Sequence, residues 1–199
     1  TGKYDTSSLV TILCGGSAAP RSLIKTYEYT YKIPFRHLYG MTETTPLALL
    51  SNLKSYQTGL SEDEILDIRS KQGIIVPGLE MKIVGSEGEV EWNGRDMGEL
   101  MLKGNWITDS YYKDERTKDA FKDGWLLTGD IATIDEEGNI KLVDRTKDLI
   151  KSGGEWISSV DLENALMAHE AVFEASVVAV PHAQWQERPV GCVVLKPEY

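Results

Sequence analysis

The sequence of 199 residues lacks the features that mark secreted and membrane-spanning proteins. It has only two cysteines, Cys14 and Cys192, which lie far apart and form no CxxC pair, so a reducing compartment is favoured over a disulfide framework. No apolar run approaches the roughly 18 residues that a membrane-spanning helix requires. The first residues carry no basic region followed by an apolar stretch, so no signal peptide is visible. We therefore expect a soluble, cytoplasmic protein without a transmembrane segment.

Positive charge is also scarce. The chain has 21 Lys and Arg against 31 Asp and Glu, which gives a formal net charge of -10. Because a nucleic-acid groove needs clustered positive charge, we expect no nucleic-acid partner. The chain does have 41% apolar residues, which at this length is enough for one or two domains with a buried core.

The first forty residues predict a strand, a helix and a second strand. Residues 9–14 form a β-prone apolar run, typical of a strand that a parallel sheet buries on both faces. A glycine turn follows, then a helix from Pro20 to about Lys32, and a second strand at 35–39. This order is the α/β signature, and ligand sites are expected beyond the carboxyl ends of such strands.

The rest of the chain predicts a capped helix and then many short strands. Ser61 is placed to cap a helix within residues 60–73. Ser158 or Ser159 is placed to cap a second helix, and we expect a domain boundary before it, at about 145–148. Strands are predicted at 79–84, 99–103, 131–135, 140–144, 148–151, 175–180 and 190–195, with a hairpin loop at 136–139.

Two clusters of small and polar residues follow the first two predicted strands. In the first, Gly15-Gly16-Ser17 allows a ligand to approach the backbone at a helix start, although an ordinary tight turn would explain this motif alone. In the second, Tyr39-Gly40-Met41-Thr42-Glu43 places an aromatic ring, a hydroxyl and a carboxylate together. Such groups can pack on a purine, bond a phosphate and bind Mg²⁺, whereas a polar capping loop would explain only the threonines.

Two further clusters lie near the expected domain boundary. Thr128-Gly129-Asp130 places a carboxylate on a glycine turn, where it could take two ribose hydroxyls or merely stabilise its own turn. Residues 144–157 combine basic groups with glycines, which can meet an anionic ligand in a cleft or permit rotation; the alternative is a solvated connector.

Taken together, the four clusters resemble a known superfamily. The motifs YGMTE, GEL, LTGD and DRTKDLIKSGG occur in the order found in the adenylate-forming superfamily of acyl-CoA synthetases, luciferases and peptide-synthetase adenylation domains. The stretch DRTKDLIKSGGEWIS, with Pro181-His182 and residues 185–189, is most similar to medium- and long-chain fatty acyl-CoA synthetases. The resemblance spans essentially the whole chain.

The resemblance implies an α/β fold in two parts. Residues 1–145 would be the last part of a large α/β AMP-binding domain, including a small β-rich, distorted-barrel subdomain. Residues 146–199 would be a hinge and the start of a small α+β C-terminal domain. The family's upstream phosphate loop and its C-terminal Gly-Lys find no match, so the resemblance implies a fragment that is inactive by itself.

The resemblance also implies a reaction. An acid–thiol ligase of this family joins a fatty acid to ATP with Mg²⁺, releases pyrophosphate, and passes the acyl group to CoA with release of AMP. Two alternatives stay open: an adenylation enzyme that loads an acyl carrier protein, and a non-catalytic nucleotide-binding homologue.

Carried over by motif, the resemblance assigns roles to three groups of residues. The catalytic group comprises Thr42 on phosphate, Glu43 as the metal ligand, and Lys151 near AMP or the thioester. Lys147 takes the hinge position. The residues assigned to ATP, AMP or CoA are Gly15, Gly16, Ser17, Tyr39, Gly40, Met41, Asp130, Arg145, Gly153, Gly154 and Trp156.

Overall fold

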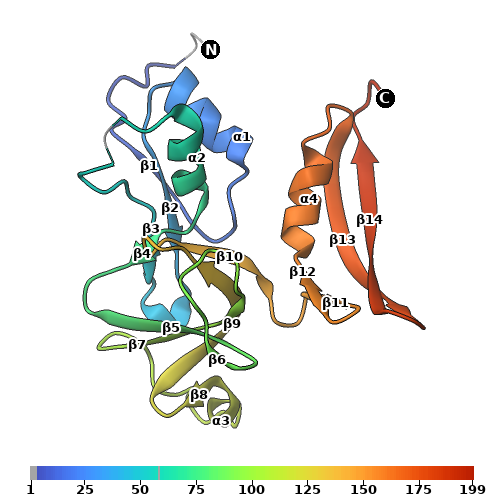
Figure 1. The fold of residues 1–199 in the computed structure, drawn as a ribbon. Coiled ribbons are helices and arrows are strands. Elements are labelled where there is room, and N and C mark those ends of the chain that lie inside the picture. The colour runs from blue at the N-terminus through green and yellow to red at the C-terminus, as the bar shows by residue number, and fades with distance from the viewer. Residues whose placement is uncertain (1–3, 58) are drawn as a thin grey trace. The chain divides into compact units, whose positions relative to one another are not determined.

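The structure of the protein is a computed structural model that describes residues 4–57 and 59–199. The chain is mixed α/β and consists mostly of sheets, as the sequence predicts (Figure 1). It divides into two units: Thr1–Thr128 with Thr133–Lys141, and Gly129–Ala132 with Leu142–Tyr199. The domain boundary after residue 145 stays a prediction. Among the described residues, no helix has the length and apolar character needed to span a bilayer.

The first sheet begins with the predicted strand–helix–strand unit. Strand β1 (Ile12–Cys14) pairs in parallel with β2 (Phe35–Tyr39), and the crossover contains α1 (Arg21–Lys25) and a π-helical turn (Thr26–Thr30). Two short strands complete the sheet, in the order β1-β2-β3-β4: β3 (Leu49–Leu50) and β4 (Ile74–Ile75).

The prediction of a long strand buried on both faces is wrong for residues 9–14. Only Ile12–Cys14 is a strand, and Leu9, Val10 and Leu13 are exposed, Val10 by 82%. The physical reason is that β1 is the edge strand of this sheet, so among the described residues it pairs only with β2 and lacks the second neighbouring strand that a central strand has. Apolar composition at residues 9–14 therefore predicts burial, but the described residues do not bury Leu9, Val10 or Leu13.

The core beside the first sheet is small and well defined. Ile24, Phe35 and Leu66 are fully buried and bring α1, β2 and α2 (Glu62–Ser70) together. Helix α2 has the predicted cap, since Ser61 Oγ accepts a hydrogen bond from Glu64 N and the Glu64 carboxylate accepts one from Ser61 N. The capping box fixes where the helix begins.

The second sheet is curled into a half-barrel and confirms the predicted β-rich part (Figure 1). Its order is β10-β9-β7-β5-β6, with β8 paired to β9. A short helix, α3 (Thr117–Ala120), precedes β8. The strands are β5 (Leu79–Gly85), β6 (Gly88–Glu89), β7 (Gly98–Gly104), β8 (Phe121–Lys122), β9 (Trp125–Ile134) and β10 (Ile140–Arg145).

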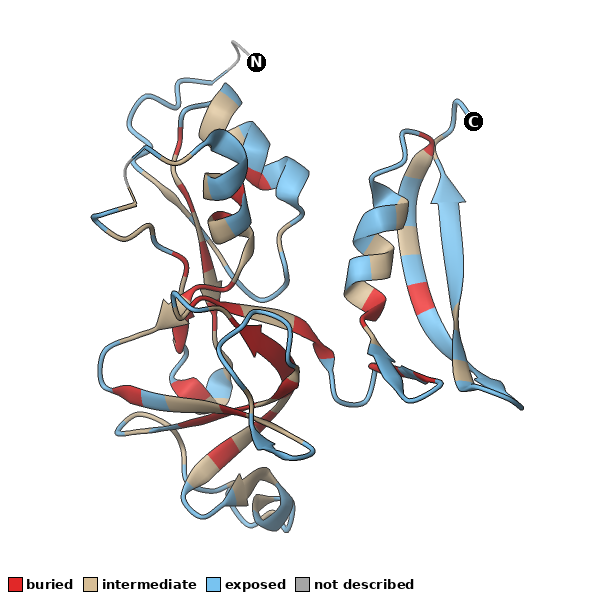
Figure 2. Cartoon of the chain, viewed as in Figure 1, coloured by how far each residue is buried: buried red, intermediate tan, exposed pale blue. Residues whose placement is uncertain are grey.

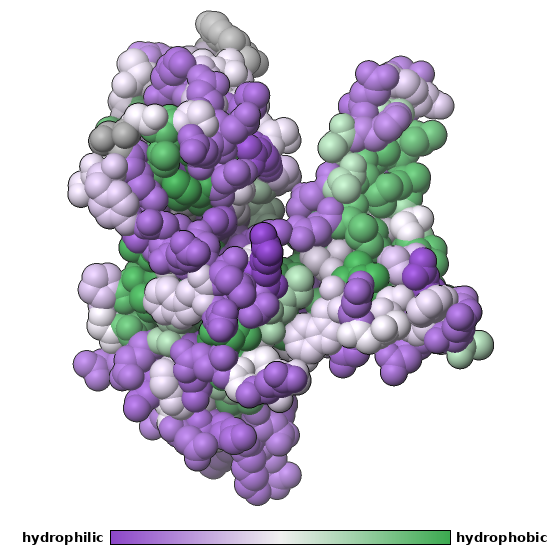
Figure 3. Space-filling view, viewed as in Figure 1, coloured by the Kyte–Doolittle hydropathy of each residue, from purple (hydrophilic) through white to green (hydrophobic). Residues whose placement is uncertain are grey.

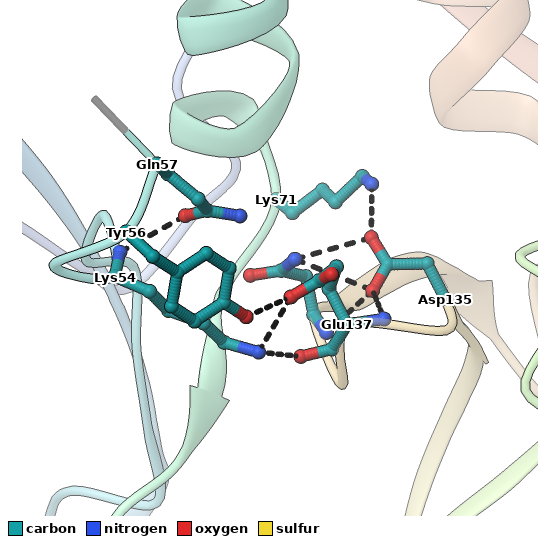
Figure 4. Close-up of polar contacts among 7 residues, drawn as sticks. Lys54, Tyr56, Gln57, Lys71, Asp135 and Glu137 are labelled. Carbon is teal, nitrogen blue, oxygen red and sulfur yellow. Dashed lines mark hydrogen bonds and ion pairs between the residues drawn. The ribbon is translucent and has the colours of Figure 1, made fainter. Parts of the chain in front are cut away.

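The loop between β9 and β10 is held by charged side chains (Figure 4). Asp135 Oδ1 accepts hydrogen bonds from the backbone N–H groups of Glu137 and Asn139, and Lys71 Nζ lies 2.5 Å from Asp135 Oδ2. Lys54 Nζ lies 2.9 Å from Glu137 Oε2. Burial would raise the pKa of Asp135, but the hydrogen bonds from Lys71 and Asn139 outweigh it and hold that pKa below its usual value.

This lowered pKa predicts an acid-sensitive contribution to stability. A carboxyl with a depressed pKa stabilises the fold above its unfolded pKa of about 4, and the contribution is lost as pH falls through the folded value. We expect Asp135→Asn to lower the free energy of unfolding by about 1–3 kcal/mol at pH 7 and by much less near pH 2. Urea unfolding at both pH values measures this. Glu136→Gln, at an exposed position of the same loop, is the control. An equal loss at both pH values would contradict the assignment.

The third sheet has the order β12-β11-β14-β13 and carries α4 (Ser159–Met167). Ser158 caps α4 as predicted, since its Oγ accepts a hydrogen bond from Asp161 N. The four strands are β11 (Ile150–Ser152), β12 (Glu155–Ile157), β13 (Val172–His182) and β14 (Gln186–Leu195).

The long β13–β14 hairpin buries little of its own surface. Figure 2 shows most of both strands as exposed, and Figure 3 shows apolar residues gathered over them. The exposed apolar side chains here are Phe173, Val178, Val180, Val190, Val193, Val194 and Leu195.

Candidate functional site

The loops that follow β1 and β2 lie at one edge of the first sheet. Because these strands are parallel neighbours, their carboxyl ends point the same way, which brings two of the predicted clusters together. Gly15 packs on β2, where a Cβ would lie 3.2 Å from Leu38 O. Gly16 has a φ of +92°, with open space around it. Glycine thus lets this loop lie flat on the neighbouring strand and turn sharply away.

His37 fastens the loop to β2. Its side chain is 1% exposed, and Nε2 lies 3.2 Å from Ser17 O and 3.3 Å from Ala19 N. Within the described residues, the buried Nδ1 has no hydrogen-bond partner. Sequence reasoning gave His37 only a structural or surface role, and its position beneath the glycine loop could not be predicted from spacing.

The loop after β2 is shaped by close backbone contacts. A Cβ at Gly40 would lie 1.6 Å from Pro46 O, so only glycine fits there. Met41 N donates a hydrogen bond to Thr44 Oγ1, and Thr44 is fully buried. These contacts hold the short 3-10 helix Thr42–Thr44, which leaves Thr42 exposed and Glu43 half-buried. Tyr39, the predicted purine-packing residue, is itself buried at the end of β2.

Glu43 is held by a segment that the sequence did not indicate. Tyr111 donates a hydrogen bond of 2.6 Å to Glu43 Oε1, and Thr108 N donates one of 2.9 Å to Glu43 O. The hydrogen bond to the Glu43 carboxylate, together with burial, raises the pKa of Tyr111 above its ordinary value. The hydroxyl therefore stays protonated at neutral pH. No sequence signal connects two residues that are 68 positions apart.

The donor set at Glu43 suits Mg²⁺ that arrives with a phosphorylated ligand. Among the described residues, no group of three or more His, Cys, Asp or Glu side chains could hold a metal ion. Mg²⁺ is usually bound by one or two carboxylates together with water and substrate phosphates, not by a cage of protein ligands. One half-exposed carboxylate beside the exposed Thr42 hydroxyl fits that pattern.

A separate cavity of about 440 Å³ opens along the segment that follows β7. Lys103, Thr108 and Phe121 are among its lining residues. None of the site residues predicted from the sequence lines it.

In the second unit, Asp130 and Arg145 form an ion pair. Asp130 is 5% exposed, and Arg145 Nε lies 2.7 Å from its Oδ1. The expectation that Asp130 sits on a glycine turn is wrong, because it lies inside β9. Gly129 has a φ of +71°, which lets the strand kink without ending. Thr146 N and Thr146 Oγ1 both donate hydrogen bonds to Gly129 O at the kink.

Four more predicted residues lie together on the β11–β12 hairpin. Lys151 and Trp156 are directly opposite each other, and Gly153 and Gly154 form the turn with positive φ. A Cβ at Gly153 would lie 2.8 Å from the Trp185 ring, so this glycine also makes room for an aromatic side chain.

Lys147, the predicted hinge, is exposed in the turn after β10. Hydrogen bonds connect the residues on either side of it. Ser158 Oγ donates a bond of 2.6 Å to Val143 O, and Ser159 N donates one of 2.7 Å to Asp144 Oδ2. Asp144 therefore joins the end of β10 to the first turn of α4.

The structure thus brings predicted residues together within each unit. The convergence of Tyr39 and Glu43, in the first unit, with Asp130 and Arg145, in the second, stays a prediction.

Comparison with known families agrees with the motifs. Residues 1–112 match the model of the AMP-binding enzyme family, and residues 161–199 match the model of the AMP-binding enzyme C-terminal domain. The first match alone covers more than half of the chain. The chain belongs to the AMP-binding enzyme family.

Individual proteins of known name are also similar to this chain. The chain is 50% identical to a long-chain-fatty-acid–CoA ligase of Thermus thermophilus, over 94% of the chain and 35% of the relative. It is 41% identical to a medium-chain-fatty-acid–CoA ligase of Ectopseudomonas oleovorans, over 96% and 35%. Among solved structures, o-succinylbenzoate CoA synthetase of Bacillus subtilis with ATP and magnesium ion has a TM-score of 0.78 at 32% identity, over 93% of this chain and 36% of that one. The chain spans about a third of the length of these relatives.

Proposed function

We propose that this chain is part of an ATP-dependent fatty acid–CoA ligase that forms AMP. The observation that carries the proposal is the edge of the first sheet, where a glycine loop and a loop bearing Thr42 and Glu43 lie side by side. Relatives named as long- and medium-chain fatty acid ligases support the choice of substrate class.

The reaction proceeds in two transfers. A fatty-acid carboxylate oxygen attacks the α-phosphorus of ATP, the bond to pyrophosphate breaks, and an acyl-adenylate forms. The CoA thiol then loses its proton and attacks the acyl carbon, and AMP leaves with the electrons of the acyl–oxygen bond. Since the carboxylate and the phosphates repel each other, the site must neutralise charge while it holds the anions in contact.

In the first transfer, residues of the first unit bind and orient the nucleotide. Gly15, Gly16 and Ser17 line the adenine, against which Tyr39 packs, and Thr42 donates a hydrogen bond to phosphate. Glu43 would hold Mg²⁺, which, when bound, neutralises phosphate charge. A solved relative that contains ATP and magnesium ion supports this assignment.

Residues of the second unit complete the proposed assignment. Asp130 accepts hydrogen bonds from the ribose hydroxyls, and Arg145, its ion-pair partner, lies nearby on ribose or phosphate. Gly153, Gly154 and Trp156 line the path of the CoA pantetheine, with Lys151 beside them, and Lys147 is the hinge between the two transfers.

The experiment measures exchange between ATP and pyrophosphate on the full-length protein, with and without fatty acids of increasing length. We expect exchange with medium- or long-chain acids, and release of AMP only after CoA is added. Exchange without transfer to CoA, but with transfer to a phosphopantetheinyl carrier protein, would favour the carrier-loading alternative. Nucleotide binding without exchange for any acid would favour a non-catalytic homologue.

We further propose that the protein works in the cytoplasm. The thiols of Cys14 and Cys192 are both free, which suits a reducing compartment. Cell fractionation tests this, and recovery in a membrane-bounded organelle, as in relatives named peroxisomal, would contradict it.

A further inference from the structure

A second segment, Trp106–Tyr111, cradles the loop that carries Glu43. Four hydrogen bonds join the two. Trp106 Nε1 donates to Leu47 O at 3.2 Å, and Thr45 Oγ1 donates to Trp106 O at 3.0 Å. The other two go to Glu43 itself, from Thr108 N to its carbonyl oxygen and from Tyr111 to its carboxylate. The position of Glu43 therefore depends on a part of the chain that lies beyond β7.

The Tyr111 ring is fixed independently of Glu43. It meets Phe121 edge-on, with ring centroids 6.0 Å apart, and the Arg116 guanidinium lies 5.8 Å from its centroid. Tyr111 N donates a hydrogen bond of 2.9 Å to Thr117 Oγ1. Because Phe121 of β8 contacts the ring and Thr117 of α3 binds the Tyr111 backbone, the hydroxyl is presented from a defined direction.

The hydrogen bond from Tyr111 engages only one oxygen of the Glu43 carboxylate. Tyr111 donates its single hydroxyl proton to Oε1, and Oε2 accepts no hydrogen bond from the described residues. A carboxylate fixed through one oxygen keeps the other in a defined place, and partners of this kind orient metal ligands.

We propose that Tyr111 is a positioning residue, which holds the Glu43 carboxylate so that Oε2 faces the magnesium ion of bound ATP. The inference rests on the metal role proposed for Glu43. It adds a residue that none of the recognised motifs contains.

The test compares Tyr111→Phe with Tyr112→Phe in the full-length protein. Phenylalanine keeps the ring and its packing and removes only the hydroxyl, while the neighbouring Tyr112 is 88% exposed and serves as the matched control. The readout is the binding of Mn²⁺, which serves as a probe for Mg²⁺, to the protein in the presence of a non-hydrolysable ATP analogue. Electron paramagnetic resonance measures this binding directly.

We expect Tyr111→Phe to weaken Mn²⁺ binding about tenfold, which is the low end for loss of a partner that orients a metal ligand. The Mg²⁺ concentration for half-maximal activity should rise by the same factor, while kcat at saturating Mg²⁺ changes little. Replacing Tyr111 by 4-aminophenylalanine, which restores an N–H donor on the same ring, should recover most of the binding. Tyr112→Phe should match the unchanged protein.

The outcomes separate this inference from the proposed function. If Glu43→Gln leaves Mn²⁺ binding unchanged, the metal role of Glu43 fails. If Glu43→Gln weakens binding and Tyr111→Phe does not, only the role of Tyr111 is overturned. A uniform fall in kcat at every Mg²⁺ concentration, with Mn²⁺ binding intact, would show a structural role and also overturn it.

Discussion

In the full-length protein, replacing Glu43 with glutamine is expected to slow acyl-adenylate formation by about 10²–10³-fold, the usual cost of removing one electrostatic stabiliser from a reacting centre. Glutamine keeps the length of the side chain, and its oxygen can still accept the Tyr111 hydrogen bond. What it removes is the negative charge that Mg²⁺ requires. The loss of adenylation activity is measured as the rate of exchange between pyrophosphate and ATP across a range of Mg²⁺ concentrations.

The matched control for this prediction is Glu87→Gln. Glu87 is an exposed carboxylate in the turn between β5 and β6, in the same unit as Glu43. It loses the same charge far along the chain from the nucleotide motifs and should leave exchange unchanged. Turnover that survives Glu43→Gln would reject the metal role of this residue.

In the full-length protein, replacing Lys147 with proline is expected to impair one half-reaction by about 10²-fold, the cost of misplacing reacting groups by about 1 Å, and to spare the other. Proline fixes φ near −65° and restricts the residue before it, so rotation about φ at this position is blocked. Among the described residues the Lys147 N–H donates no hydrogen bond, so proline removes none. Single-turnover measurements of adenylate formation and of thioester formation separate the two steps.

Lys147→Ala is the control, because it removes the charged side chain and leaves the backbone free to rotate. Both half-reactions should continue in that variant. If proline slows adenylation and thioester formation equally, a hinge at Lys147 is ruled out.

The sequence predicts best those elements whose causes are local. Ser61 and Ser158 both cap helices as predicted, because a cap depends on residues within three positions. The strand that ends at Tyr39 and the turn at Gly153-Gly154 also lie where the pattern puts them.

The structure departs from the sequence prediction where the cause lies far along the chain. Val10 is apolar and β-prone, yet it is exposed, since burial requires a neighbouring strand that composition cannot supply. The glycine before Asp130 predicts a turn there, whereas strand β9 continues through the kink at Gly129. Tyr111 belongs to no motif, and only the fold brings it to Glu43.

The hydrogen bond between Asp144 and Ser159 has a consequence for the energy of any rotation at Lys147. If the chain rotates at Lys147, two hydrogen bonds must break first. They are the bond from Ser159 N to the Asp144 carboxylate and the bond from Ser158 Oγ to Val143 O. Two such bonds, one of them to a charged group, would contribute a threshold of about 2–4 kcal/mol. These two hydrogen bonds would therefore favour the arrangement described here over a rotated one by the same amount, and that difference would have to be offset by new contacts in the rotated state.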